Sequence, residues 1–242
     1  VCINEFLIFK HGRMHMQARR GFVPDDEKNF SDTAMPILHK AAKDMCYLIN
    51  AGYDRKQAST FVGNHYCLSE RQRLAVARSV ATDKQLTNRK AKEVFDFGKK
   101  DVWIDGFNQI ITLEVLLNHS PLFLGMDGVV RDLASLRGNY RIIPQTKQAV
   151  ALLLEWVYAY HPGTIHILLD APVSNSGRLK TKIYDVDPMV DVQIVQHVDL
   201  ILYEKANVIT SDSIILDSCI SWFNLMVLCL KKTHFMAYDI EF

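Results

Sequence analysis

Apolar residues at helical spacing characterise the first half of the chain. Residues 31–49 place their apolar side chains on one helical face, and Ser31 or Asp32 can cap this helix. Gly52 ends the run, and Asp54 can cap a shorter helix that closes at Gly63. Residues 69–72 then form the capping box of a third helix. The pattern predicts a small all-helical domain over residues 19–98.

From residue 101 onward, short apolar and β-branched runs alternate with helical segments. This alternation is typical of a parallel sheet with right-handed crossovers. The strongest helical stripe covers residues 145–160, and residues 190–195 alternate apolar and polar side chains as a strand does. Residues 213–222 predict a late helix. We therefore predict an α/β domain over residues 101–242, joined to the helical domain near residues 92–100.

Four of the apolar runs end in an aspartate. The runs are residues 102–105, 122–127, 165–170 and 208–212, which end in Asp105, Asp127, Asp170 and Asp212. In a parallel sheet, ligands bind outside the carboxyl ends of buried strands. A single aspartate after a strand more often caps the next helix, but four of them at the ends of neighbouring strands predict one acidic site.

Clustered carboxylates require protons or a hard cation to offset their repulsion. Oxygen ligands without cysteine or histidine at metal spacing select Mg²⁺ or Mn²⁺ over zinc or copper. Two such ions can flank a phosphodiester, where one activates water and the other stabilises the leaving oxygen. Hydrolysis of nucleic acid is therefore the expected reaction.

Basic residues gather between residues 71 and 100, although the whole chain has 28 Lys and Arg against 27 Asp and Glu. The basic residues are Arg71, Arg73, Arg78, Lys84, Arg89, Lys90, Lys92, Lys99 and Lys100. Such a run is usually a solvated face. The alternative is contact with the phosphates of a polyanion, and we expect Arg71 and Arg73 to bind RNA.

The remaining sequence features bear on location and ligands. The five cysteines show no C-x-x-C spacing, which fits a reducing cytoplasm, and no apolar run is long enough to span a membrane. An apolar tail with Phe235, Met236 and Phe242 suggests a homodimer. Ser174 and Ser176 lie in a turn that either binds a phosphate or caps its own helix. No P-loop or G-x-G-x-x-G motif is present.

Four segments carry a family resemblance: residues 104–108 (Ile-Asp-Gly-Phe-Asn), 127–132 (Asp-Gly-Val-Val-Arg-Asp), 170–177 (Asp-Ala-Pro-Val-Ser-Asn-Ser-Gly) and 210–213 (Thr-Ser-Asp-Ser). They resemble an uncharacterised prokaryotic family whose carboxyl half is assigned to the PIN-like superfamily, near the NYN nucleases. Residues 20–73 resemble that family's helical amino half, a domain of unknown function. The resemblance implies a three-layer α/β/α fold, a Mg²⁺ or Mn²⁺ site and, in many members, endoribonuclease activity.

The resemblance assigns the first-strand acid to Asp105 and the late-strand acid to Asp212, while Asp170 matches a central-strand acid less closely. We expect these three to bind the metal, with Asp127 or Asp132 completing the shell or orienting water. Asn108 is expected to hold Asp105 and to help bind substrate, and Arg131 is expected to meet a phosphate. Whether Glu114 or Asp217 joins the site stays open.

The leading hypothesis is a metal-dependent nuclease that acts on RNA in preference to DNA. In a second hypothesis the protein is a non-catalytic RNA-binding or interaction module, in which the acids merely cap helices. A third is a metal-dependent phosphatase for a small metabolite, which predicts a closed pocket instead of an open groove.

Overall fold

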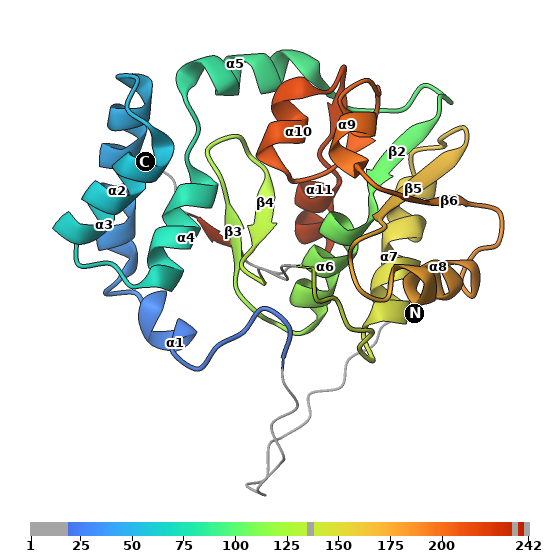
Figure 1. Ribbon diagram of the computed structural model, residues 1–242, viewed down its shortest axis with the longest axis horizontal. Helices are drawn as coiled ribbons and strands as arrows, with labels where there is room; N and C mark the ends of the chain where they lie inside the picture. The colour runs from blue at the N-terminus through green and yellow to red at the C-terminus, as the bar shows by residue number, and fades with distance from the viewer. Residues whose placement is uncertain (1–18, 135–137, 234–236, 240–242) are drawn as a thin grey trace, which may run out of the picture.

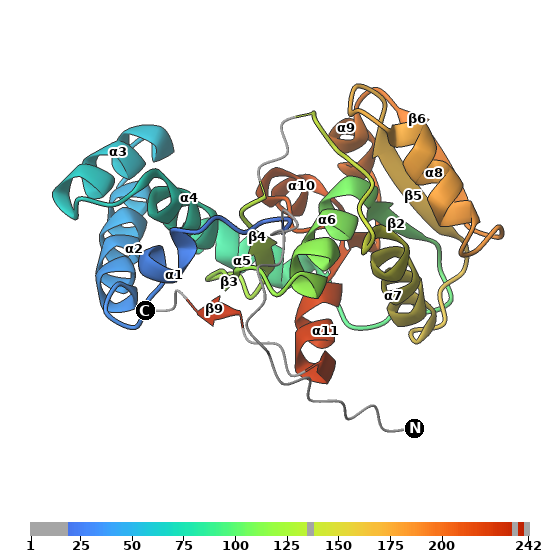
Figure 2. The same cartoon turned by 90° about the horizontal axis from the view of Figure 1, so that it is seen from below.

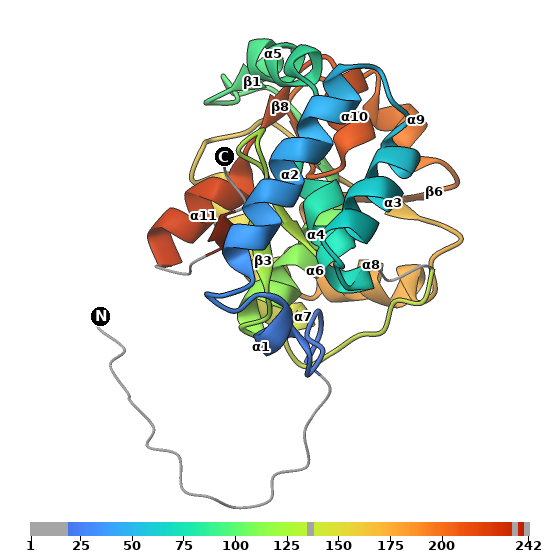
Figure 3. The same cartoon turned by 90° about the vertical axis from the view of Figure 1, so that its left-hand side faces the viewer.

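The computed structural model describes residues 19–134, 138–233 and 237–239 of the 242-residue chain. Its amino-terminal part is helical, with α1 (Asp26–Asn29), α2 (Met35–Asn50), α3 (Arg55–His65), α4 (Glu70–Ser79) and α5 (Asp83–Lys92). Figures 1 and 3 show α1 to α4 gathered at one end of the molecule. The residues expected to form an apolar dimer surface, Phe235, Met236 and Phe242, lie outside the described residues.

Two of the three expected helix caps are present. The third is not, because α2 begins at Met35 with Ala34 at its N-cap, and neither Ser31 nor Asp32 caps it. Asp54 accepts a hydrogen bond of 2.9 Å from the Gln57 N–H, and Ser69 forms the predicted capping box with Gln72. The apolar face predicted for α2 is buried against Phe30, Val62 and Val76. The same core includes Phe123 from the second half of the chain, so the helical region does not close its core alone.

A six-stranded parallel sheet forms the second part, in the order β1-β8-β7-β2-β5-β6. The strands are β1 (Glu93–Val94), β2 (Val102–Asp105), β5 (Ile165–Asp170), β6 (Asp191–Val195), β7 (Val208–Ile209) and β8 (Trp222–Phe223). From β2 the chain adds β5 and then β6 on one side, and it later adds β7 and β8 on the other side. The order therefore reverses beside β2, which is where ligands bind in sheets of this kind.

Helices cover both faces of this sheet. Ile104 and Ile167 face α6 (Gly106–Leu117), α7 (Thr146–Tyr158), α8 (Ser176–Tyr184) and α11 (Leu225–Thr233) in the largest apolar core. Leu168 and Val208 point to the other face, where they share a core with α9 (Val198–Leu202) and α10 (Ser213–Ser218). Figure 2 shows α7 and α8 beside β5 and β6. The expected α/β/α layering is thus present.

The run of residues 122–127 is not a strand of this sheet, in contrast to the sequence prediction. Its strand, β3 (Leu122–Leu124), pairs antiparallel with β4 (Val130–Asp132) and parallel with β9 (Tyr238–Asp239) in a separate sheet. The chain reverses at Asp127 and Gly128, and Gly128 has a φ of +70° that favours glycine. Asp127 therefore lies in a hairpin turn.

One carboxyl-terminal element also differs from the prediction. The helix expected over residues 213–222 ends at Ser218, and Trp222 belongs to β8. Residues 225–230 form most of α11. The described part of the chain contains no helix long and apolar enough to cross a membrane.

Candidate functional site

Three of the predicted aspartates lie at one edge of the parallel sheet. Asp105 is the last residue of β2, Asp170 is the last residue of β5, and Asp212 follows β7 by three residues. Because β2 pairs with both β5 and β7, all three carboxylates are carried by adjacent strands. Asp105 and Asp212 flank the place where the strand order reverses.

Asp105 is buried without a cationic partner among the described residues. Only 6% of its surface is exposed, and its carboxylate accepts one hydrogen bond of 2.8 Å, from the Thr210 hydroxyl. Burial raises the pKa of Asp105 to about 7, and the negative charges of Asp212, Asp170 and Asp199 add to this rise. The Thr210 hydrogen bond acts in the opposite direction. Asp105 therefore titrates near neutral pH.

The close approach of α6 to the sheet fixes the position of Asp105. Gly106 follows it at the start of α6, where a Cβ atom would lie 2.7 Å from the Leu168 carbonyl oxygen of β5. That distance is shorter than any real Cβ contact, so only glycine fits without a backbone shift. Asp105 occupies the N-cap of α6 but makes no capping hydrogen bond. Helix capping therefore does not explain why a carboxylate is buried here.

Asp212 differs from Asp105 in this respect. Its Oδ1 atom accepts hydrogen bonds of 2.8 and 3.2 Å from the N–H groups of Ile214 and Ile215, so it caps α10. The same carboxylate raises the pKa of Asp105 and of Asp199. Asp212 thus caps α10 and also places a negative charge close to Asp105 and Asp199.

Asp199 is a fourth acid in this group, which the sequence analysis missed. Burial raises its pKa, and the charges of Asp212 and Asp170 raise it further. Burial also raises the pKa of Asp170, against the lowering effects of the Val198 N–H and His197. Asp199 lies four residues after β6, a strand that the alternation of residues 190–195 had predicted. The rule that selected the other acids, an aspartate at the carboxyl end of a predicted strand, could have selected Asp199 as well. We call Asp105, Asp170, Asp199 and Asp212 the acidic quartet.

The carboxylate oxygens of the acidic quartet are suitable ligands for a hard cation, but they do not surround a single metal position. Among the described residues, no three acidic, histidine or cysteine side chains come close enough together to hold a metal ion by themselves. Mg²⁺ usually keeps several waters and binds through one or two carboxylates plus substrate phosphates. Carboxylates without a cationic partner, such as Asp105, fit that open mode of binding.

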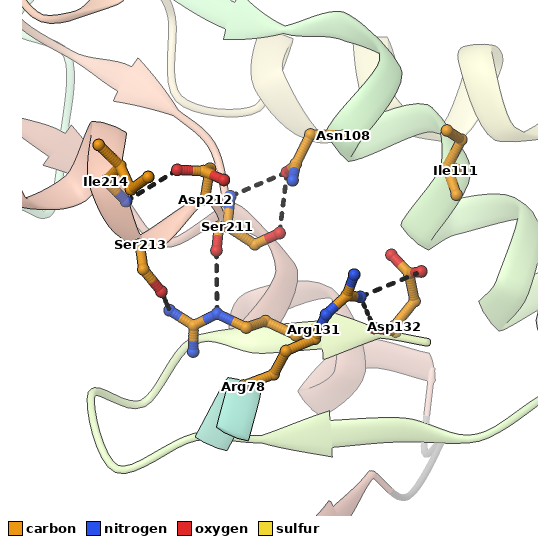
Figure 4. Close-up of a pocket in the computed structure, with 9 residues that line it drawn as sticks. All are labelled: Arg78, Asn108, Ile111, Arg131, Asp132, Ser211, Asp212, Ser213 and Ile214. Carbon is orange, nitrogen blue, oxygen red and sulfur yellow. Dashed lines mark hydrogen bonds and ion pairs between the residues drawn. The ribbon is translucent and has the colours of Figure 1, made fainter. Parts of the chain in front are cut away.

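Asn108 does not hold Asp105, contrary to expectation. Its side-chain oxygen accepts hydrogen bonds of 2.9 and 2.8 Å from the N–H and hydroxyl of Ser211 (Figure 4). The group that holds Asp105 is the Thr210 hydroxyl, which also accepts a hydrogen bond of 3.0 Å from the Asp212 N–H. Asn108 and Thr210 together fix the segment that delivers Asp212.

Asp127 and Arg131 form an internal ion pair instead of meeting metal and phosphate. Arg131 contacts both oxygens of Asp127 at 2.8 and 2.6 Å, and Arg89 contacts Asp127 at 2.5 Å. Burial opposes ionisation of Asp127, but the two guanidiniums outweigh it and hold its pKa below the usual value. Arg131 also donates to the Ser211 carbonyl at 2.9 Å. Arg131 is therefore a positioning residue for the segment before Asp212.

Asp132 lies apart from the acidic quartet and has its own partners. It accepts hydrogen bonds of 2.9 Å from Thr112 and 2.7 Å from the Ala134 N–H. The Arg78 guanidinium lies 3.9 Å from its carboxylate and donates to its backbone carbonyl. Neither Asp127 nor Asp132 completes the acidic quartet in this structure.

A pocket of about 370 Å³ opens beside Asp212, between the helical region and the α/β region (Figure 4). Arg78 reaches it from α4, Ile111 from α6, and Asp132 from β4. The other lining residues are Asn108, Arg131, Ser211, Asp212, Ser213 and Ile214. Four of the predicted site residues therefore lie at this pocket: Asn108, Arg131, Asp132 and Asp212.

The other expected substrate contacts are engaged inside the protein. Arg71 pairs with Asp26 at 2.8 Å and donates to the Leu133 carbonyl, while Arg73 donates to the carbonyl of Leu68 and the side chain of Asn64. These guanidiniums stabilise packing, so Arg71 and Arg73 do not form a free RNA-binding face. Lys84, Lys90, Lys99 and Lys100 of that run are exposed.

The serine turn also has internal partners. The Ser174 hydroxyl donates to the Tyr140 carbonyl at 2.9 Å, and Asn175 adopts a left-handed φ of +64° just before α8 begins at Ser176. The Ser174 contact supports the reading of this segment as a structural turn. Ser174 and Ser176 follow Asp170, the last residue of β5, by four and six residues.

The two acids left open by the sequence lie outside the acidic quartet. Glu114 is fully buried, pairs with Arg20 at 2.8 Å and accepts a hydrogen bond of 2.7 Å from Tyr140. Asp217 accepts hydrogen bonds of 2.7 Å from both Gln85 and Arg89, which ties α10 to α5. Both carboxylates serve structural contacts.

Comparison with known proteins places the chain among relatives of unrecorded activity. Residues 94–227 match the model of a domain of unknown function (DUF5616), and residues 37–92 match that of a protein of unknown function (DUF434). An uncharacterized protein of Methanocaldococcus jannaschii, MJ0935, is 40% identical over 187 residues, which cover 75% of this chain and 89% of the relative. No solved structure matches the chain significantly. The chain belongs to the DUF5616 family.

Proposed function

We propose that the protein is a metal-dependent nuclease that hydrolyses phosphodiesters of RNA at the acidic quartet. The observation that carries this proposal is Asp105, a buried carboxylate at the point of strand reversal with a pKa of about 7 and three acidic neighbours. A site that costs folding free energy in this way is typical of functional sites. The PIN-like resemblance of the sequence supports the same reading.

In this proposal, two of the carboxylates expected as ligands, Asp105 and Asp212, would bind Mg²⁺ or Mn²⁺ together with a substrate phosphate, while Asp170 and Asp199 would add negative charge beside them. A divalent cation bound there supplies a Lewis acid and lowers the pKa of a coordinated water. Thr210 keeps Asp105 oriented and favours its ionised form through its hydrogen bond. Arg131 and Asn108 hold Ser211, which fixes the backbone that carries Asp212.

A single-stranded RNA is the substrate that fits this geometry. The acidic quartet lies at an open sheet edge, and the pocket beside Asp212 continues that edge toward the helical region. An open edge of this kind admits a chain, whereas a small metabolite requires an enclosing pocket. The exposed Lys84 and Lys90 lie on α5, which contacts α10 through Gln85 and Arg89, and they supply positive charge for the strand outside the site.

The test is a cleavage assay on labelled single-stranded RNA with Mn²⁺ or Mg²⁺. We expect cleavage by the wild-type protein, loss of cleavage with a chelator, and a rate below about one per cent for Asp105→Asn. Asp185→Asn is the matched control, because Asp185 is an exposed aspartate at the end of α8 whose ion-pair partner among the described residues is Lys182. Cleavage by Asp105→Asn at the wild-type rate would contradict the proposal.

One observation favours a second candidate, a non-catalytic RNA-binding module. The described residues contain no group of three acids or histidines at metal-binding distance, and Asp212 caps α10. This candidate predicts RNA binding that is unchanged by a chelator and an absence of cleavage with either metal. The same assay, read for binding as well as cleavage, separates the two.

A further inference from the structure

The pocket beside Asp212 has the size and the wall chemistry of a small-molecule site. Its volume of about 370 Å³ lies within the range of about 300–1,000 Å³ typical of such sites. It forms where α4 of the helical region meets α6, β4 and the start of α10. Sites at the junction of two structural units are common because both units contribute walls.

Two apolar side chains and several polar groups face this space. Ile111 lies on α6 and Ile214 on α10, and Figure 4 shows them on opposite sides of the polar residues. Ile214 is 60% exposed, so its side chain is accessible to a ligand. Apolar walls that flank hydrogen-bonding groups suit a flat heterocycle whose edge is polar.

The polar groups offer both donors and acceptors. The Asn108 side-chain oxygen is occupied by Gln109 and Ser211, and within the described part of the chain its amide nitrogen donates no hydrogen bond. The side chain of Arg78 is 35% exposed, so part of its guanidinium is open to a ligand. Asp132 and Asp212 supply acceptors but disfavour a free anion in the pocket. A neutral nucleoside matches this mixture better than inorganic phosphate does.

We propose that this pocket holds one nucleoside of the RNA strand, adjacent to the phosphodiester at the acidic quartet. The proposal rests on the proposed function, because it takes the ligand to be part of the same substrate. Asp212 connects the two places: it lines the pocket, and its charge acts on Asp105 and Asp199. Arg78 then meets the backbone or ribose at the pocket edge.

The test compares two isoleucines of similar exposure, one that lines the pocket and one that does not. Ile214 and Ile220 are 60% and 62% exposed, and Ile220 is not a lining residue of the pocket. Binding of a fluorescent single-stranded RNA is measured by anisotropy in the presence of a chelator, so that no cleavage occurs. We expect Ile214→Glu to weaken binding about tenfold, because the new carboxylate lies beside the strand, and Ile220→Glu to weaken it less than about twofold.

A direct probe accompanies the variants. Adenosine and uridine should shift the methyl resonances of Ile111 and Ile214, whereas inorganic phosphate at the same concentration should leave them unchanged. Equal losses of affinity in both variants, or methyl shifts with phosphate alone, would overturn the proposal. If the wild-type protein cleaves RNA but Ile214→Glu and Ile220→Glu bind RNA equally well, the nucleoside pocket is wrong and the nuclease assignment stands. If the two variants differ in RNA affinity but the wild type does not cleave RNA, the nuclease assignment is wrong and the pocket stands.

Discussion

The Thr210 hydroxyl donates a hydrogen bond of 2.8 Å to Asp105 and accepts one of 3.0 Å from the N–H of Asp212. A single buried hydroxyl therefore joins the acid at the end of β2 to the segment after β7. Thr210 is only 4% exposed, so water does not compete for these hydrogen bonds. The geometry of the acidic quartet depends on this contact.

Replacing Thr210 with valine should raise the pKa of Asp105 further. The variant keeps the shape of the side chain but removes the donor that favours the ionised carboxylate. We expect the acidic limb of the pH–rate profile to move upward by roughly one pH unit. Thr112→Val is the control, because it removes a buried hydrogen bond of 2.9 Å to Asp132 outside the acidic quartet. Equal shifts in both variants would contradict the assignment.

Asp199→Asn should move the same limb in the opposite direction. The charge of Asp199 raises the pKa of Asp105, so its removal should lower that pKa, by less than about one unit. The measurement is again the pH–rate profile, supported by a carboxyl NMR titration of Asp105. If the profile moves upward, or if only the maximal rate changes, Asp199 does not act on Asp105 through its charge.

The raised pKa of Asp105 predicts how stability depends on pH. The pKa of Asp105 in the folded protein is about 7, above the ordinary aspartate pKa of 3.8, so the folded state binds the proton more tightly than the unfolded state. The contribution of Asp105 to stability is therefore present at low pH and is lost as the pH rises toward 7. Asp105→Asn removes this dependence.

Urea unfolding at pH 5 and pH 8 measures the effect. The free energy of unfolding of Asp105→Asn, relative to the wild type, should increase by about 2–3 kcal/mol between the two pH values. Saturating Mg²⁺ should reduce the difference at pH 8, because a bound cation favours the ionised carboxylate. A relative stability that is the same at both pH values would rule out a strongly raised pKa.

Arg131→Met should destabilise the protein, because it leaves the carboxylate of Asp127 buried with one partner fewer. Asp127 and Arg131 side chains are 2% and 7% exposed, and breaking such a pair typically costs about 3–5 kcal/mol. The double variant Asp127→Leu with Arg131→Met should recover part of this loss, since no unpaired charge remains. Chemical unfolding of the three proteins is the measurement, and a double variant less stable than Arg131→Met would contradict this reading.

The apolar runs were sufficient to predict the strands that carry Asp105 and Asp170. Both strands are largely buried on two faces, so their sequences are mainly apolar, and a strand that ends in an acid places that acid at the carboxyl edge of the sheet. The run before Asp127 is equally apolar, but its strand, β3, packs against the helical region and does not join the parallel sheet. The Asp127–Gly128 pair is a typical hairpin turn, and giving it more weight would have excluded Asp127 from the parallel sheet.

The partners of charged side chains were not predictable from local sequence. Arg71 finds Asp26 across 45 residues, and Arg131 reaches the carbonyl of Ser211 across 80 residues. Such contacts depend on how the helical region packs against the sheet. The cluster of basic residues in the sequence therefore showed that this segment is positively charged, but not whether its side chains are exposed to solvent.

Calorimetric titration with Mn²⁺ above pH 7 tests most directly whether the acidic quartet is one cation site. The wild-type protein, Asp105→Asn and the control Asp185→Asn are titrated under the same conditions. We expect the wild type and the control to bind Mn²⁺ alike and Asp105→Asn to lose binding, because Asp105 supplies the buried charge that the cation offsets. Absence of binding to the wild type, or equal binding to all three proteins, would contradict a cation site at Asp105.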